Sequence, residues 1–281
     1  MSIRVLHHWA CSGGTLISKC IAAHQDTLLL SEIHPYSYIR LMLPENQAEH
    51  YCHYGNILQQ LSLPQNGADP LLCLAYFNGS IAGIHGECIK LNKNLVLRSH
   101  SHIDFFVGAI TPELPVISSQ LRRSYELLEL ISVRHPLDSW LSLKAAGWDK
   151  HFRFSCFNEY CKRCLAMIEA CDGMPLIYYE HFCLNPTESL HEICEALNLP
   201  YDPASLNKIG EISMTGSSGR ASNKISPRER REIPKDIETA LQHSPAYITL
   251  CERLNYDHRS TSSHPYTLGG CTNGAQERTE D

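Results

Sequence analysis

The sequence predicts an α/β fold in which a largely parallel central sheet lies between two layers of helices. Short apolar runs of the kind found in buried strands alternate with segments whose apolar residues recur at helical spacing. The turns between them are short, and 281 residues are enough to bury a large core. The regular alternation indicates one domain over residues 1–257 rather than two independent units.

The strands are recognised by how their apolar runs end. The first run ends at a Ser-Gly-Gly-Thr turn, the second at Glu32, the third at Arg98, and the fourth at Arg134 ahead of a proline that begins a helix. The strands expected are 3–8, 27–31, 95–98, 128–133 and 176–179. The helices expected are 15–24, 136–146, 155–171, 186–197 and one at about 245–255.

Two regions depart from this alternation. A mostly helical insertion is expected near residues 36–94, with helical segments at 36–43, 47–61 and 71–91 and a proline-marked break at 64–70. Residues 258–281 are polar without an apolar period, which predicts a disordered tail.

The turn after the first strand predicts an anion-binding site. Its residues Ser12, Gly13, Gly14 and Thr15 break a strand and begin a helix, so that unpaired backbone N–H groups point to one place. Nucleoside triphosphatases need Gly-Lys-Ser/Thr at this point, and this turn contains no Gly-Lys pair. A 5′-phosphate or phosphosulfate bound without a metal fits this P-loop-like turn better than Mg-ATP does. An ordinary tight connection is the alternative.

A second anion-binding group follows the fourth strand. Arg134 is expected at the carboxyl end of a parallel strand, where open α/β sheets gather ligands, and Ser142 comes eight residues later on the next helix. A guanidinium gives a phosphate two parallel hydrogen bonds, and a hydroxyl adds a third. The alternative is a surface arginine paired with Asp138.

These segments resemble the sulfotransferases that use 3′-phosphoadenosine 5′-phosphosulfate (PAPS). The stretch CSGGTLI is similar to the family's 5′-phosphosulfate loop, and VRHPLDSWLSL is similar to its 3′-phosphate strand and helix, with the same Arg-to-Ser spacing. Residues 176–200 and the Ser-Gly-Arg segment within 217–234 resemble two further family stretches, so the similarity covers about residues 3–257.

The resemblance implies a set of donor-binding residues. A loop over residues 212–234 is implied to cover the nucleotide, and the insertion at 36–94 to cover the acceptor. Tyr76 and Phe77 would then belong to an aromatic acceptor pocket, or else to the core. The residues implied to bind the donor are Cys11, Ser12, Gly13, Gly14, Thr15 and Leu16 around the 5′-phosphosulfate, and Arg134, Ser142, Gly219 and Arg220 around the 3′-phosphate.

The loop departs from the family pattern at two positions. Most members have an arginine or lysine where this chain has Cys11, and a neutral thiol supplies no positive charge. Lys19 or Arg98 would have to compensate, or the enzyme would be slow. Many relatives also have threonine where this chain has Gly14, which leaves Thr15 to donate a hydroxyl to the transferred group.

Two residues compete for the role of catalytic base. Glu32 ends the second strand, 21 residues after Cys11, and matches the catalytic glutamate of tyrosine-protein and carbohydrate sulfotransferases. Its alternative role is that of a carboxylate at a helix N-terminus. His100, in Arg-Ser-His, is similar to the Lys-Thr-His of cytosolic members, whose histidine is the base.

The net charge and the distribution of basic and apolar residues limit the kinds of molecule that the protein is expected to bind. The net charge of −6 argues against nucleic acid and polyanionic substrates. Basic residues near 220–231, including Arg230, either hold one nucleotide or form a solvated loop. There is no signal-like segment and no run approaching the roughly 18 apolar residues of a membrane span, so the chain is expected to be reduced, cytoplasmic and without a membrane partner.

The 13 cysteines include a Cys-x-x-Cys pair, Cys161 and Cys164, that invites a metal or redox interpretation. Cys161 and Cys164 fall on one helical stripe with Phe157, Ile168 and Cys171. This pattern predicts that they pack into the core and do not form a metal site.

The sequence therefore predicts transfer of a sulfuryl group from PAPS to the hydroxyl of a small-molecule or carbohydrate acceptor. A P-loop nucleotide kinase or NTPase, and a sulfotransferase-like binding protein with weak turnover, are the alternatives. No pattern selects the acceptor or the oligomeric state.

Overall fold

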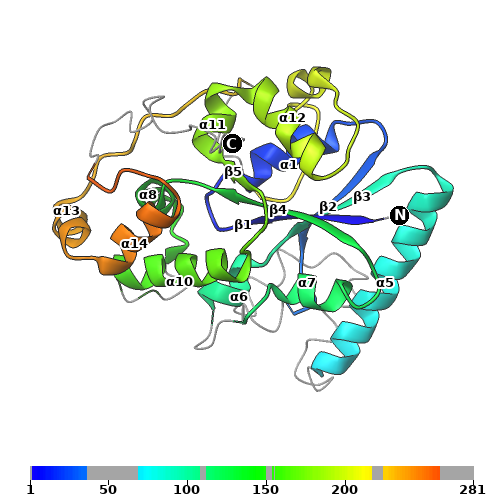
Figure 1. Ribbon diagram of the computed structural model, residues 1–281, viewed down its shortest axis with the longest axis horizontal. Helices are drawn as coiled ribbons and strands as arrows, with labels where there is room; N and C mark the ends of the chain where they lie inside the picture. Colours follow the sequence, from blue (N-terminus) through cyan, green and yellow to red (C-terminus); the bar gives the residue numbers. More distant parts are fainter. Residues whose placement is uncertain are drawn as a thin grey trace, which may run out of the picture.

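The computed structural model describes residues 2–36, 69–107, 112–149, 154, 156–216 and 224–259. Within these residues one five-stranded sheet has the strand order β2-β3-β1-β4-β5, and every neighbouring pair is parallel (Figure 1). The strands are β1 (Ile3–His8), β2 (Thr27–Ile33), β3 (Asn94–Ser99), β4 (Leu127–Val133) and β5 (Leu176–Tyr178). The expected α/β fold with a parallel sheet is confirmed, and each expected strand lies within two residues of its expected bounds.

Helices cover both faces of the sheet and form three layers (Figure 1). One face is covered by α1 (Gly14–Ala22), α11 (Tyr179–Leu184) and α12 (Pro186–Ala196). The other is covered by α5 (Pro70–Lys90), α6 (His102–Phe106), α7 (Val116–Leu121) and α10 (Phe157–Ala170). Side chains alternate along β1, so Leu6 packs on the α1 side and Val5 on the α5 side, both fully buried.

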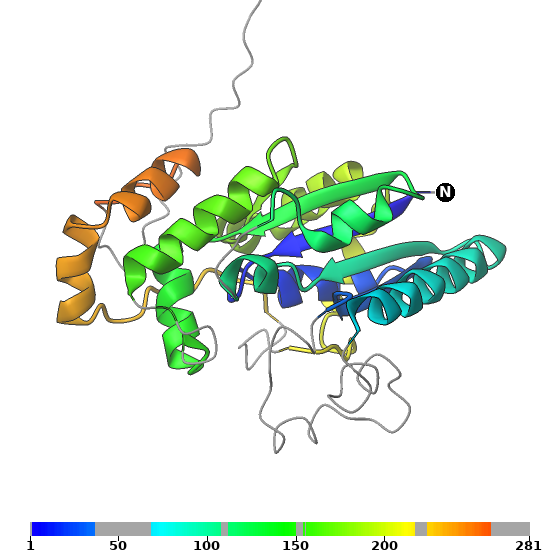
Figure 2. The ribbon, with the colours of Figure 1, turned by 90° about the horizontal axis from the view of Figure 1, so that it is seen from below.

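The remaining helices lie beyond the carboxyl ends of the strands, at the end of the molecule opposite the label N (Figures 1 and 2). They are α8 (Pro136–Ala145), α13 (Lys235–Gln242) and α14 (Pro245–Arg253). A short 3-10 turn, η2 (Pro203–Asn207), follows α12. With α6 and α10, the helices α8 and α14 bury a third apolar cluster that contains Trp9, Trp140 and Tyr247.

Several short helices were not expected from the sequence: α6, α7, α11 and α13. Each has eight residues or fewer, so it contains too few turns to produce a helical period. Of the expected insertion, α5 is helical, and its Phe77 is 5% exposed in the core beneath β1 and β3. The segments expected at 36–43 and 47–61 lie, after Tyr36, outside the described residues, as does the expected tail after Arg259.

The cysteine stripe of α10 is packed into the core as expected. Cys161 and Cys164 are fully buried, and burial raises the pKa of both thiols well above its ordinary value. Among the residues that the structure describes, no group of three or more His, Cys, Asp or Glu side chains has the arrangement of a metal site. None of the helices in this part of the chain has the length and apolarity needed to cross a membrane.

Candidate functional site

The site is built around the loop between β1 and α1, which adopts a backbone that favours glycine. Gly13 has φ 90° and is the residue before the first turn of α1. A Cβ atom at Gly13 would overlap the ring of Tyr179, and one at Gly14 would lie 2.5 Å from Cγ of His8. Both glycines are therefore required, because aromatic rings pack directly against the loop backbone.

The N-terminus of α1 points its first N–H groups out of this loop. The N–H groups of Leu16 and Ile17 donate to the carbonyl of Gly13, which closes the first helical turn. Among the described residues no side chain caps this helix end, and its first turn contains no acidic residue. The positive end of a nine-residue helix dipole is thus available to an anion.

Arg134 joins the loop to α8. Its Nη1 donates to the carbonyl oxygen of Cys11 at 3.1 Å and to Oγ of Ser142 at 3.2 Å, and its guanidinium lies 4.8 Å from the centre of the Tyr179 ring. The arginine and serine predicted from their spacing are therefore in contact, and both lie beside the loop.

Asp138, the alternative partner considered for Arg134, is bound by Arg230. The Nε and Nη2 atoms of Arg230 lie 3.0 Å from the two carboxylate oxygens of Asp138, and the two side chains are 1% and 3% exposed. Arg230 is therefore a buried structural residue that ties the segment before α13 to α8, and the solvated-loop interpretation is wrong for it.

Glu32 and His100 lie together at the carboxyl ends of β2 and β3. The carboxylate of Glu32 forms an ion pair with Nη2 of Arg98 and lies 3.3 Å from Nε2 of His100. The two residues that compete for the role of base thus belong to one group of side chains, with Arg98 as the third member.

Arg98 is held by two side chains and one backbone carbonyl from three other segments. Its Nε donates to Nε2 of His8 at 3.1 Å, and its Nη1 donates to Oγ of Ser31 at 2.9 Å and to the carbonyl oxygen of Thr215 at 3.1 Å. Burial lowers the pKa of Arg98 to about 10, which leaves the guanidinium charged at neutral pH. It is 2% exposed and supplies a positive charge close to the loop.

Thr15 completes this group. A Cβ atom built on Gly216 would lie 3.1 Å from Oγ1 of Thr15, 3.2 Å from Nη2 of Arg98 and 3.7 Å from Oε1 of Glu32. The hydroxyl, the guanidinium and the carboxylate therefore face the same small volume, against which Gly216 lies.

His100 is a neutral imidazole in this environment. Burial, followed by the charges of His34 and Arg98, lowers the pKa of His100 to about 3, although Asp104 acts in the opposite direction. Its ring lies against that of His102, with centroids 4.5 Å apart. A side chain with so low a proton affinity is a weak base at neutral pH, which counts against His100 for that role.

Backbone conformation also marks this site. Among the described residues, five that are not glycine have positive φ, and three of these are asparagines, which tolerate that region. The other two are Cys11, with φ 65°, and Glu32, with φ 59°. A strained glutamate persists where its side chain is needed, so the observation points to a role for this carboxylate beyond packing.

The other residues predicted from the sequence have varied positions. The Ser12 hydroxyl donates to Trp9 O at 2.9 Å inside the loop, and Leu16 is buried in the core between α1 and the sheet. Lys19 is in the last turn of α1, away from the helix start. Gly219 and Arg220 lie outside the described residues.

Sequence reasoning missed three contributors: His8, Tyr179 and Thr215. His8 is not among the site residues predicted from the sequence, although its position just before the glycine loop is a usable signal. Tyr179 follows the last strand at the same edge as Arg134, and that shared edge could have identified it. Nothing in the sequence indicated that Thr215 contacts Arg98.

A scan against family models and a search of curated proteins give no match. Among solved structures, the sulfotransferase domain of the olefin synthase from Synechococcus PCC 7002 matches with a TM-score of 0.50 and 18% identity, over 91% of this chain and 94% of that one. The sulfotransferase domain from the curacin biosynthetic pathway matches with a TM-score of 0.51 and 15% identity, over 92% and 99% of the two chains. The protein therefore has the sulfotransferase fold.

Proposed function

We propose that the protein transfers a sulfuryl group from PAPS to the hydroxyl of a small-molecule or carbohydrate acceptor. The observation that carries this proposal is the convergence of Thr15, Arg98 and Glu32 at the start of α1. That group combines a hydroxyl donor, a buried positive charge and a carboxylate beside a helix N-terminus. The fold shared with the two sulfotransferase domains supports the same reaction class.

In this proposal the donor lies between the two anion-binding groups. The loop from Cys11 to Leu16 binds the 5′-phosphosulfate through backbone N–H groups, and Thr15 donates its hydroxyl to the transferred group. Arg134 and Ser142 bind the 3′-phosphate, which would replace the carbonyl of Cys11 as a partner of Nη1. Gly219 and Arg220 are assigned to the 3′-phosphate on the sequence resemblance, within a covering loop at 212–234.

Arg98 would provide the cation that the loop lacks at Cys11. Sulfuryl transfer is expected to be an in-line displacement, in which the protein supplies position and positive charge rather than covalent chemistry. Nη1 and Nη2 of Arg98 are bound to Thr215, Ser31 and Glu32, and they can turn to sulfuryl oxygens when a donor enters. The loss of the loop cation is thereby offset from the neighbouring strand.

Glu32 would take the proton of the acceptor hydroxyl. At the same time the acceptor oxygen would bond to sulfur, and the bond between sulfur and the bridging oxygen of the donor would break. The ion pair with Arg98 orients the carboxylate. His100, neutral and 3.3 Å from the other carboxylate oxygen, would orient Glu32 rather than replace it. The leaving group is 3′,5′-adenosine bisphosphate.

Two binding experiments and one transfer experiment test the proposal. Isothermal titration should give tighter binding of 3′,5′-adenosine bisphosphate than of Mg-ATP, and the reverse order would favour a kinase or NTPase. Arg134→Ala should weaken the binding of the bisphosphate. Arg253→Ala, which removes an exposed arginine paired with Asp172, should leave that binding unchanged. Transfer of labelled sulfuryl from PAPS to a metabolite extract separates an enzyme from a binding protein, since only the enzyme labels a product.

A further inference from the structure

Two adjacent histidines at the end of β1 point to opposite faces of the sheet. His7 is fully buried and His8 is 4% exposed. Side chains alternate along a strand, so His7 lies on the face covered by α7 and His8 on the face covered by α1. Both reach residues of β3, the strand paired with β1 in the register Leu6 to Arg98.

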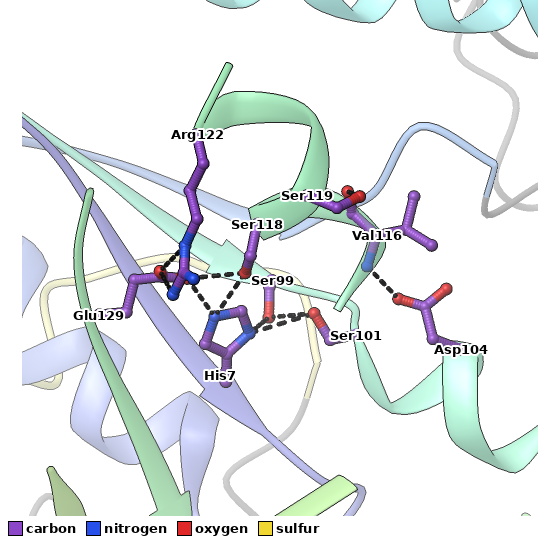
Figure 3. A network of polar contacts seen from close by, with 9 residues as sticks. All are labelled: His7, Ser99, Ser101, Asp104, Val116, Ser118, Ser119, Arg122 and Glu129. Carbon is purple, nitrogen blue, oxygen red and sulfur yellow. Dashed lines mark hydrogen bonds and ion pairs between the residues drawn. The ribbon is translucent and has the colours of Figure 1, made fainter. Parts of the chain in front are cut away.

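On its Nε2 side, His7 belongs to a buried network that ends at Arg122 (Figure 3). Nε2 lies 3.0 Å from Oε1 of Glu129, which also accepts from Ser118 at 2.6 Å, while Arg122 Nε donates to Oε2 at 2.9 Å. Burial alone would raise the pKa of Glu129, but hydrogen bonds from His7, Ser118 and Arg122 lower it to about 2. An ionised carboxylate only accepts, so Nε2 of His7 carries a hydrogen.

On its other side, His7 holds the two serines that flank His100. Nδ1 lies 2.9 Å from Oγ of Ser99 and 3.1 Å from Oγ of Ser101, and Ser101 donates to Ser99 at 2.8 Å (Figure 3). The Ser101 hydrogen is used in that bond, which leaves the Ser99 hydrogen for Nδ1. A single line of donors therefore runs from Ser101 through Ser99 and His7 to Glu129.

His8 makes the complementary contact on the opposite face. Its Nε2 accepts from Nε of Arg98 at 3.1 Å, and its Nδ1 lies 3.1 Å from the carbonyl oxygen of Trp9. Burial, reinforced by the charge of Arg98, lowers the pKa of His8 well below its ordinary value, so the ring is neutral. Because an arginine always donates, the single ring hydrogen of His8 must be on Nδ1.

We propose that His7 and His8 are positioning residues for sulfuryl transfer, His7 fixing the turn that carries His100 and His8 fixing Arg98. This inference rests on the proposed function. It requires opposite tautomers in neighbouring residues, with the hydrogen on Nε2 in His7 and on Nδ1 in His8. Gly14 belongs to the same arrangement, since any side chain there would displace the His8 ring from Arg98.

The tautomers are measured directly by nuclear magnetic resonance on protein labelled with ¹⁵N-histidine. The imidazole nitrogen shifts of His8 should place its hydrogen on Nδ1, and those of His7 should place a hydrogen on Nε2. A His8 ring with its hydrogen on Nε2 cannot accept from Arg98 and would overturn the inference. His8→Gln and His7→Gln proteins assign the two sets of signals. No donor or acceptor is needed, so the result is independent of the proposed function.

The kinetic test compares variants that differ in one hydrogen bond. His8→Leu removes the acceptor for Arg98, whereas the amide oxygen of His8→Gln can replace it. We expect the leucine variant to transfer labelled sulfuryl from PAPS to 4-nitrophenol, glucose or octanol on the order of tenfold more slowly, and the glutamine variant to recover most of the rate. The affinity for 3′,5′-adenosine bisphosphate, which has no sulfuryl group, should be unchanged in both.

The same comparison applies to His7. His7→Gln keeps an N–H donor for Glu129 but releases the two serines, and it should lower the transfer rate. Ser119→Ala removes a neighbouring hydroxyl of α7, which donates to the carbonyl oxygen of Val116, and serves as the control with unchanged turnover. Equal turnover in His7→Gln, His8→Leu and the unaltered protein would overturn the positioning role. If the unaltered protein binds neither PAPS nor the bisphosphate, the proposed function fails, and the inference fails with it as a statement about catalysis.

Discussion

The buried histidines predict that the protein loses stability in mildly acidic solution. Burial is the main cause that lowers the pKa of five histidines. Four shifts are large, to about 3 for His100, to about 4 for His135, and well below the ordinary value for His8 and His102, and the pKa of His24 is lowered in the same direction. In the unfolded chain each takes up a proton at about pH 6.5. Below that pH the unfolded state binds more protons than the folded state, so stability falls as the pH falls toward 4.

The size of the effect follows from these shifts. A histidine that titrates at about 6.5 when unfolded and stays neutral when folded costs about 1 kcal/mol between pH 7 and pH 5.5. Four such groups cost about 4 kcal/mol, a large part of the roughly 5–15 kcal/mol that stabilises a typical domain. Glu129 adds nothing in this range, because its lowered pKa, about 2, matters only below its unfolded value near 4.5.

Urea unfolding at several pH values measures this dependence. The slope of the unfolding free energy against pH should correspond to about four protons taken up by these histidines near pH 5.5, less any proton that the folded state takes up at Glu180, whose pKa burial raises. His135→Gln should reduce that slope by about one proton, whereas substitution of the exposed His243 should leave it unchanged. A free energy of unfolding that is flat between pH 7 and 5.5, or a slope that His135→Gln does not alter, would refute the reasoning.

Three further predictions concern single side chains. Glu32→Gln should slow sulfuryl transfer roughly 10²-fold at unchanged affinity for 3′,5′-adenosine bisphosphate, as expected for loss of a base; a fully active Glu32→Gln with an inactive His100→Asn would reverse the two roles. Arg134→Ala should weaken the binding of the bisphosphate by about 2 kcal/mol in isothermal titration, and an unchanged affinity would exclude a contact between Arg134 and the 3′-phosphate. Arg230→Ala should lower the free energy of unfolding by about 3–5 kcal/mol, because the buried Asp138 carboxylate loses its arginine. Urea unfolding measures that loss, and one below about 1 kcal/mol would contradict the structural role.

Much of the fold was predictable because it depends on local patterns. Apolar runs and the residues that end them defined all five strands within two residues, since buried parallel strands are almost continuously apolar. The same pattern explains why Glu32, Arg98 and Arg134 lie at one edge of the sheet, because parallel strands end on the same side of a sheet. Each of these conclusions uses only residues adjacent in the sequence.

The contacts that could not be predicted join residues far apart in the sequence. Arg230 and Asp138 are separated by 92 positions, and Arg98 contacts the carbonyl of Thr215, which is 117 positions away. A backbone carbonyl oxygen has no sequence signature. A cluster of basic residues in the sequence does not reveal which of its members is buried. The positive φ of Glu32 was also invisible, because glutamate ordinarily avoids that region.

The position of Thr215 and Gly216 has a consequence for any measurement of affinity. An anion that approaches Arg98 competes with the protein's own backbone, since the Thr215 carbonyl already accepts from Nη1 and Gly216 lies against the hydroxyl of Thr15. The apparent dissociation constant is therefore the intrinsic one divided by the fraction of molecules in which this segment has moved aside. A variant in which residues 214–216 are shortened would raise that fraction. It would therefore bind the same anion more tightly than the intact chain does, with no change in the binding site itself.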